Sequence, residues 1–151
     1  RSPDYDDWSL DGDLLIYDKK ITKCIYIIRY NIKNKKGEKD TRPWGTWEVL
    51  AVGSNYIVKR IIVNAHQKLS LQSHNHRAEH WIIANGEAMV VLGEDTIFCK
   101  KDEAIYIPVK TKHRIKNTSS TENLVFIEVQ TGETLDEDDI IRFDDNYGRV
   151  S

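Results

Sequence analysis

A chain of 151 residues is long enough for one domain with one hydrophobic core. Apolar residues make up 40% and charged residues 30%, and 22 basic against 24 acidic side chains leave a net charge of −2. This balance excludes the basic excess of proteins that bind nucleic acid or an anionic membrane, although local basic clusters still allow a small anionic ligand. No apolar run approaches the roughly 18 residues that span a bilayer.

The cysteine content indicates the compartment. Cys24 and Cys99 are far apart in the sequence and do not have the spacing of a metal site. Because there is neither a disulfide framework nor a signal peptide, we expect a cytoplasmic protein. The chain begins with Arg1 rather than Met, so we treat it as a candidate fragment of a longer protein.

The first 40 residues differ from the rest. Residues 1–13 are acidic and rich in turn formers, while residues 14–17 and 21–32 have the Ile and Tyr content of strands. The polar run NIKNKKGEKD, residues 31–40, indicates a loop or linker. We therefore predict an N-terminal extension over residues 1–40 and a main domain over residues 41–151.

From residue 46 onward the pattern is almost entirely that of strands. Asn85-Gly86 is a strong signal for a tight hairpin turn, and a helix is plausible only over residues 135–141. Short strands at this spacing favour an antiparallel sandwich or barrel, hence an all-β fold. The strands are expected over residues 56–63, 69–74, 79–84, 88–92, 96–99, 104–107, 113–117 and 124–130.

The segment LSLQSHNHRAEHW, residues 69–81, concentrates side chains that bind metals. Alternation along a strand places Gln72 and His74 on one face. Glu79 opens the next strand and His113 a later one, so all four side chains can converge at one rim. Two imidazoles, a carboxylate and an amide oxygen suit one divalent metal ion, with zinc first and cobalt, manganese, nickel or iron as alternatives.

The spacing of these residues resembles the two motifs of the cupin fold, a jelly-roll barrel. Gln72-x-His74, four residues, Glu79, six residues and Gly86 match the first motif, with Gln72 in place of its first histidine. Asp102, five residues, Pro108-x-Lys110, two residues, His113, three residues and Asn117 match the second motif, with Asp102 and Lys110 in place of its glycines. A rival pair, His74 and His76, leaves only two residues before Glu79 and fits the first motif less well.

Three glycines of the cupin motifs are replaced here, by His66, Asp102 and Lys110. Glycine adopts a positive φ without strain, so we expect these three turns to be built differently.

Several further blocks are similar to one cupin family, the type II phosphomannose isomerases, which often form the C-terminal domain of bifunctional mannose-1-phosphate guanylyltransferase/mannose-6-phosphate isomerases. The resemblance implies metal-dependent interconversion of mannose 6-phosphate and fructose 6-phosphate, with Gln72, His74, Glu79 and His113 as ligands. Residues 1–40 do not resemble the nucleotidyltransferase half, so this chain is not expected to make GDP-mannose. The matching blocks are RPWG (42–45), WE (47–48), LSLQ (69–72), HRAEHW (76–81), IP (107–108), IEVQTG (127–132), EDDI (137–140) and YGR (147–149).

Three residues are candidates for catalytic roles in such an isomerisation. Arg77 is two positions before Glu79, so on a strand both side chains point to the same face. Arg77 is therefore expected in the pocket, where it would bind the phosphate or stabilise a negatively charged enediolate, with a surface salt bridge as the alternative. Lys59 lies mid-strand, where it can face inward as base or phosphate partner, or outward into solvent. Glu128 lies between apolar neighbours and is a candidate inward carboxylate.

Other polar and aromatic residues have weaker assignments. Arg142 and Arg149 are candidates for binding the sugar phosphate, with a surface role as the alternative. His80 is expected on the outer face or in the core. His66 is expected to be exposed, whereas His76 is assigned equally to the pocket rim and to solvent. Packing is the favoured role of Trp44, Trp47 and Trp81.

Two alternatives to this function remain open: an isomerase or epimerase acting on another sugar phosphate, and a non-catalytic sugar-binding cupin. The expected partner is a small sugar phosphate, with no nucleic acid and no membrane. Because cupins are often dimers, a homodimer is expected, with residues 1–40 as a candidate contact region.

Overall fold

Runs rich in β-branched and aromatic residues form most of the strands in the computed structural model, which describes residues 34–146 and 148. Within these residues there are eleven strands and no helix, and thus no helix long and apolar enough to cross a bilayer. The strands are β1 (Lys39–Arg42), β2 (Gly45–Val52), β3 (Tyr56–Val63), β4 (Leu71–Ser73), β5 (Ala78–Asn85), β6 (Glu87–Leu92), β7 (Asp95–Lys100), β8 (Ala104–Ile107), β9 (His113–Asn117), β10 (Leu124–Thr131) and β11 (Ile141–Asp144).

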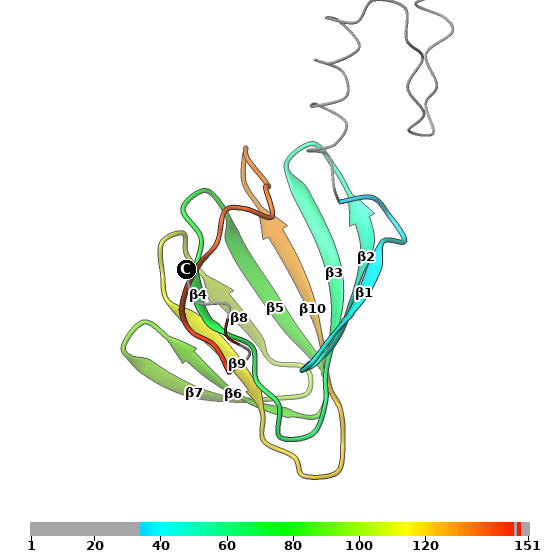
Figure 1. Cartoon of the computed structure of the whole chain (residues 1–151), viewed down its shortest axis with the longest axis vertical. Coiled ribbons are helices and arrows are strands. Elements are labelled where there is room, and N and C mark those ends of the chain that lie inside the picture. The colour runs from blue at the N-terminus through cyan, green and yellow to red at the C-terminus, as the bar shows by residue number, and fades with distance from the viewer. Residues whose placement is uncertain (1–33, 147, 149–151) are drawn as a thin grey trace, which may run out of the picture. The chain divides into compact units, whose positions relative to one another are not determined.

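The strands form two antiparallel sheets that face each other (Figure 1). One has six strands in the order β1-β2-β3-β10-β5-β8, and the other has five in the order β11-β4-β9-β6-β7. Strands that are distant in sequence are neighbours in both sheets, as in the pairing of β10 with β3 and β5. This arrangement is the jelly-roll barrel that the sequence predicts.

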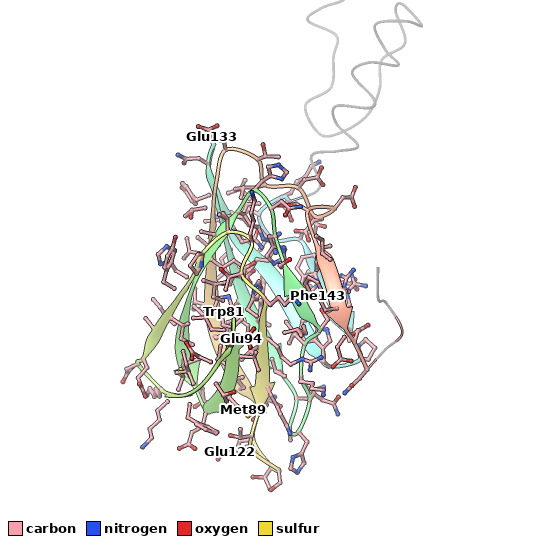
Figure 2. The ribbon with its side chains drawn as sticks, turned by 90° about the vertical axis from the view of Figure 1, so that its left-hand side faces the viewer. Trp81, Met89, Glu94, Glu122, Glu133 and Phe143 are labelled. Atoms are coloured by element: carbon pink, nitrogen blue, oxygen red, sulfur yellow. The ribbon has the colours of Figure 1, made fainter. Side chains whose placement is uncertain are left out.

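Alternation along the strands decides what lies between the sheets. Residues of β10 alternate between buried and half-buried along their whole length, and β3 alternates similarly. The inward side chains include Ile83, Ile115 and Phe126, each 0% exposed, and Trp81 lies among them inside the barrel (Figure 2). Burying an aliphatic or aromatic side chain of this size contributes about 1.5–3 kcal/mol, so this core is the main source of stability.

The hairpin predicted at Asn85-Gly86 is wrong. The turn exists and Gly86 has a φ of 86°, but β5 pairs with β10 and β8, whereas β6 pairs with β7 and β9. The turn therefore carries the chain from one sheet to the other. A Cβ at Gly86 would lie 3.1 Å from the Asn123 carbonyl oxygen, so close packing of the connecting loops also favours glycine here.

Two other local predictions need correction. Residues 135–141 do not form a helix; they make a turn that leads into β11, because the segment crosses between the two sheets. The polar run 31–40 is not a loop throughout, since Lys39 and Asp40 pair with Glu48 and Trp47 in β2. The strands predicted over residues 14–17 and 21–32, and the role of residues 1–40, lie largely outside the described residues.

The three turns that lack their motif glycines keep the glycine-like backbone, contrary to the prediction. His66, Asp102 and Lys110 have φ values of 62°, 74° and 62°. Such a conformation costs a non-glycine residue about 1–2 kcal/mol. The barrel therefore imposes the turn geometry on these side chains instead of changing the turns. His66 is exposed, as expected.

Candidate metal centre and adjoining pocket

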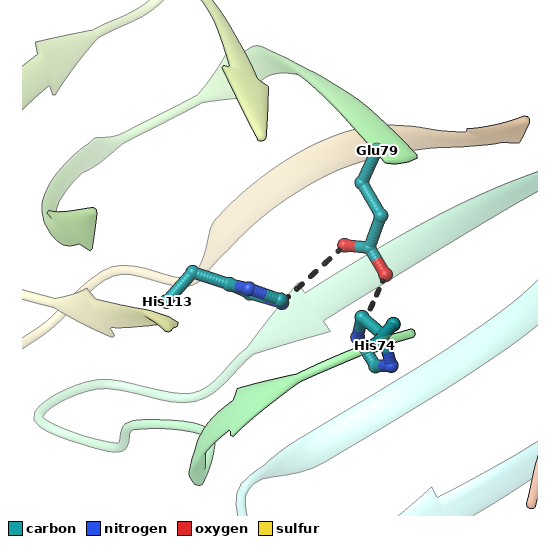
Figure 3. A group of neighbouring side chains, drawn as sticks. All are labelled: His74, Glu79 and His113. Atoms are coloured by element: carbon teal, nitrogen blue, oxygen red, sulfur yellow. Dashed lines mark ion pairs between the residues drawn. The ribbon is translucent and has the colours of Figure 1, made fainter. Parts of the chain in front are cut away.

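Three strands bring two histidines and one glutamate together at one end of the barrel (Figure 3). His74 directly follows β4, Glu79 is the second residue of β5, and His113 is the first residue of β9. All three are at most 2% exposed, and one ligand atom from each lies within 4.8 Å of the others. The convergence predicted for these three residues is therefore present.

Both imidazoles are oriented by backbone carbonyl groups. The Nδ1 of His74 lies 2.7 Å from the carbonyl oxygen of Asp139, and the Nδ1 of His113 lies 2.8 Å from that of Thr111. A carbonyl oxygen only accepts, so each Nδ1 must carry the proton and donate. The Nε2 of each ring then faces the Glu79 carboxylate, which is the arrangement that metal-binding histidines use.

The Glu79 carboxylate lies at the centre of this cluster. Its Oε1 lies 3.1 Å from the His74 Nε2 and accepts from the Arg77 guanidinium at 2.9 and 3.0 Å, while its Oε2 accepts from the Trp81 indole N–H at 2.9 Å. Burial alone would raise the pKa of Glu79, but the neighbouring Arg77 charge holds it well below its ordinary value. Glu79 is therefore an ionised carboxylate that can bind a cation.

The ring nitrogen Nε2 of His113 indicates that these residues fit a metal ion. Its buried Nε2 has no hydrogen-bond partner among the described residues and lies 3.8 Å from the Glu79 Oε2. An unpaired buried nitrogen costs about 1–3 kcal/mol, which a bound cation would offset. Burial also lowers the pKa of His113, which keeps the ring neutral and able to ligate. The two nitrogens and one carboxylate fit a divalent metal of the zinc or cobalt type.

Gln72 lies beside this centre. It is the residue paired with His113 across β4 and β9, and its half-buried side chain lines the adjoining pocket. Its role as a fourth ligand stays a prediction.

The rival pair with His76 is not supported by the geometry. The side chain of His76 is 62% exposed, lies 3.4 Å from an Asp139 carboxylate oxygen and does not belong to the cluster. His80 is on the outer face of β5, where its ring contacts the Tyr106 ring in a tilted arrangement with centroids 4.7 Å apart.

A pocket of about 130 Å³ adjoins the cluster and carries four cationic groups. Arg77 connects the two, because it lines the pocket and also contacts Glu79 and His74. Arg142 lines it as well, whereas Arg149 lies outside the described residues. The cationic residues are Arg42, Lys59, Arg77 and Arg142, and the other lining residues include Trp44, Trp47, Gln72, Glu128, Gln130 and Glu137.

Lys59 faces inward, which is one of the two orientations that the sequence allowed. It is 5% exposed; its ammonium group binds the Glu137 carboxylate at 2.7 Å and lies 4.7 Å from the centre of the Trp47 ring. Burial opposes ionisation of Glu137, but the Lys59 charge outweighs it and lowers the pKa of Glu137 below 4.5. Glu137 is therefore ionised at neutral pH and pairs with the Lys59 ammonium group.

Glu128 is the buried carboxyl group that the sequence indicates. It is 6% exposed and accepts a hydrogen bond from the Gln130 side-chain amide at 2.9 Å. Burial, followed by the nearby negative charge of Glu79, raises the pKa of Glu128 to about 8. A carboxyl group that exchanges its proton near neutral pH is suited to acid–base chemistry.

Sequence reasoning missed the parts played by Trp81, Glu137 and Asp139. Trp81 does pack in the core, yet its N–H also bonds Glu79, a contact that their shared parity on β5 could have indicated. Glu137 and Asp139 belong to the block EDDI, which was noted without a role. Their hydrogen-bond partners lie 78 and 65 positions away, so no local sequence pattern could predict these contacts.

The two sheets and the histidine–carboxylate centre define a cupin. An RmlC-like cupin from Shewanella frigidimarina superposes with a TM-score of 0.58 at 12% identity, covering 64% of this chain and 84% of that one. Bacillus subtilis oxalate decarboxylase gives 0.64 at 15% identity over 71% of this chain and 30% of that one. Likeness at these identities concerns the fold alone.

The sequence places the chain in a particular family. Residues 31–145 match the model of the family described as mannose-6-phosphate isomerase C-terminal, and the chain belongs to this family. The xanthan biosynthesis protein XanB of Xanthomonas campestris pv. campestris is 47% identical over 72% of the chain, and a mannose-1-phosphate guanylyltransferase of Salmonella muenchen is 40% identical over 89%. The chain covers only 23% and 30% of these relatives.

Proposed function

We propose that this chain is a metal-dependent aldose–ketose isomerase that interconverts mannose 6-phosphate and fructose 6-phosphate. One observation carries the proposal: two oriented imidazoles and a carboxylate converge beside a pocket with four cationic side chains. The metal-ligand set alone would suit many cupins, but the cationic pocket adds a site for a phosphorylated substrate. Family membership supports the same reaction.

The proposed ligands are His74, Glu79 and His113, with Gln72 as the fourth, and zinc is the first candidate ion. A divalent cation held there would act as a Lewis acid on the oxygens at C1 and C2 of the open-chain sugar. The four ligands come from strands of both sheets, so the barrel itself holds them in position.

The chain's own side chains would supply the rest of the chemistry. Isomerisation removes a proton from one carbon and returns it to the neighbouring carbon. Glu128 is the proposed proton carrier because it is a buried carboxyl group that lines the pocket, with Lys59 as the alternative. Arg77 would orient the sugar oxygens or stabilise developing negative charge, and Arg142, with Arg149, would bind the phosphate.

The wider context of this activity is also a proposal. Mannose phosphates are precursors of GDP-mannose, and relatives named for xanthan and alginate biosynthesis support a role in the supply of GDP-mannose for surface polysaccharides. The proposed location of this reaction is the cytoplasm. We also propose a homodimer, supported by Ile82 and Tyr106, which are 46% and 53% exposed on the outer face of the six-stranded sheet.

The decisive experiment measures metal content and isomerase activity together. Protein loaded with zinc or cobalt should convert mannose 6-phosphate to fructose 6-phosphate in a coupled assay, and EDTA should abolish turnover. His113→Ala should lose both metal and activity, whereas His80→Ala, which removes an exposed imidazole on the outer face, should keep both. Metal-loaded protein that ignores mannose 6-phosphate but isomerises another sugar phosphate would redirect the proposal. Failure on every phosphorylated sugar would favour a binding module.

A further inference from the structure

The connection between β10 and β11, residues 132–140, crosses the polar end of the barrel. We call it the strap. It must pass from one wall to the other, because β10 belongs to the six-stranded sheet and β11 to the five-stranded sheet (Figure 1). Glu133 in this connection lies at one end of the barrel, opposite Glu122 at the other (Figure 2). The strap contributes Glu137 and Ile140 to the pocket wall.

Asp139 fastens the strap to the corner between β4 and β5. Its two carboxylate oxygens accept hydrogen bonds from consecutive backbone amides, those of Asn75 and His76, each at 2.8 Å. The Asp139 side chain is only 7% exposed, and burial opposes its charge, but these two hydrogen bonds hold its pKa below its ordinary value. Two hydrogen bonds to consecutive backbone amides restrict the position of the whole residue, including its own carbonyl group.

That carbonyl group is the acceptor for His74. The two histidines of the centre therefore differ in how they are held. His113 bonds Thr111, two residues away in the same turn, so its orientation is set locally. His74 bonds Asp139, 65 residues away, so its orientation depends on the strap being in place.

We propose that Asp139 is a positioning residue for the metal centre: its carboxylate fastens the strap to the Asn75 and His76 amides, so that its carbonyl oxygen keeps the proton of His74 on Nδ1 and leaves Nε2 free to bind a cation. The inference rests on the proposed metal function and adds a residue that binds neither metal nor substrate. It also connects metal affinity with the pocket, because the same strap carries Glu137 and its bond to Lys59.

The first test is metal affinity, measured by competition with a chromogenic chelator using zinc or cobalt. Loss of an outer partner of a metal-binding histidine typically lowers affinity 10- to 100-fold. We expect about that loss for Asp139→Ala. Asp139→Asn should lose less, because its amide oxygen can still accept one of the two hydrogen bonds. The matched control is Asp138→Asn, which removes the same charge from the neighbouring exposed residue and should leave affinity unchanged.

The second test separates positioning from general loosening. Long-range ¹H–¹⁵N spectra of the histidine rings, recorded in EDTA at one neutral pH, report which nitrogen carries the proton. In Asp139→Ala the signal of His74 should shift away from the Nδ1-protonated form, while that of His113 should not move. His113 thus serves as an internal control, because its partner Thr111 is outside the strap.

The outcomes are distinct. Affinity within twofold of the unsubstituted protein together with an unchanged His74 signal would overturn the inference. Equal shifts at His74 and His113 would also overturn it, because they would indicate a loss of structure throughout the site. If the unsubstituted protein binds neither zinc nor cobalt, the proposed metal function fails, yet the His74 spectrum still decides whether Asp139 positions that ring.

Discussion

The two ends of the barrel are built from the same strands and have opposite chemistry. On β10, Phe126 and Glu128 point inward two residues apart, and on β9 Ile115 and His113 do the same. On β3 the inward pair is Ile61 and Lys59. At one end these side chains pack against one another, and at the other they form ion pairs and hydrogen bonds around a pocket.

The difference shows that one fold can assign stability and chemistry to opposite ends of its strands. Alternation places every second residue inside, whatever its polarity. Burying an apolar residue contributes free energy of folding, whereas burying a polar residue costs free energy unless it finds partners. The proposed metal and sugar phosphate sites lie at the polar end, so substitutions at the two ends should affect different measurable quantities.

The largest expected effect on stability is at the apolar end. Phe126→Ala removes a fully buried ring that lies 5.1 Å, centre to centre, from Trp81. We expect the free energy of unfolding to fall by about 3–5 kcal/mol, measured by denaturant titration in EDTA. Phe98→Ala, at a ring 70% exposed on β7, is the control and should change it by less than about 0.5 kcal/mol. If Phe126→Ala lowers the free energy of unfolding by less than about 1 kcal/mol, the apolar end is not the main source of stability and the contrast between the two ends of the barrel fails.

The next effect belongs to the polar end of the same strand. Glu128→Gln keeps the size of the side chain and an acceptor for the Gln130 amide, but it removes the proton that the carboxyl group exchanges. We expect kcat for mannose 6-phosphate to fall about 100-fold, with the free energy of unfolding unchanged or higher. Steady-state kinetics and denaturant titration of the same preparation measure kcat and the free energy of unfolding. Unchanged kcat would exclude Glu128 as the proton carrier and leave Lys59 as the candidate.

The smallest effect concerns the Lys59–Glu137 pair and its dependence on pH. The pKa of Glu137 is lowered below 4.5 in the folded protein, so the folded state binds protons less readily than the unfolded state. Its stabilising contribution is thus present above pH 4.5 and is lost as the pH falls through the folded pKa. The free-energy difference between the unsubstituted protein and Glu137→Gln should be constant near pH 7, about 1 kcal/mol or less, and should shrink below pH 4.5.

Thermal or urea unfolding of both proteins at several pH values measures this difference. A difference that grows on acidification would contradict the assignment. Glu133→Gln, at an exposed acid in the same connection, is the matched control.

Much of the site was predictable because its signals are local. The residues Gln72, His74 and Glu79 follow the spacing of the first cupin motif, and β3, β8 and β9 have the predicted bounds. Parity also placed Arg77 in the pocket and His80 outside it. The positive φ of His66, Asp102 and Lys110 was not predicted, because few non-glycine residues adopt it, even though Asp and His do so more often than most.

The sequence by itself determined most of the strands and which side chains of those strands face inward. The reason is that period-two alternation and turn chemistry act over a few residues. Only the tertiary structure decided that Asn85-Gly86 changes sheets, that the strap crosses the pocket, and that Asp139 holds His74. Those features depend on which distant faces are buried together, and the free energy of that burial is not encoded in any short stretch of sequence.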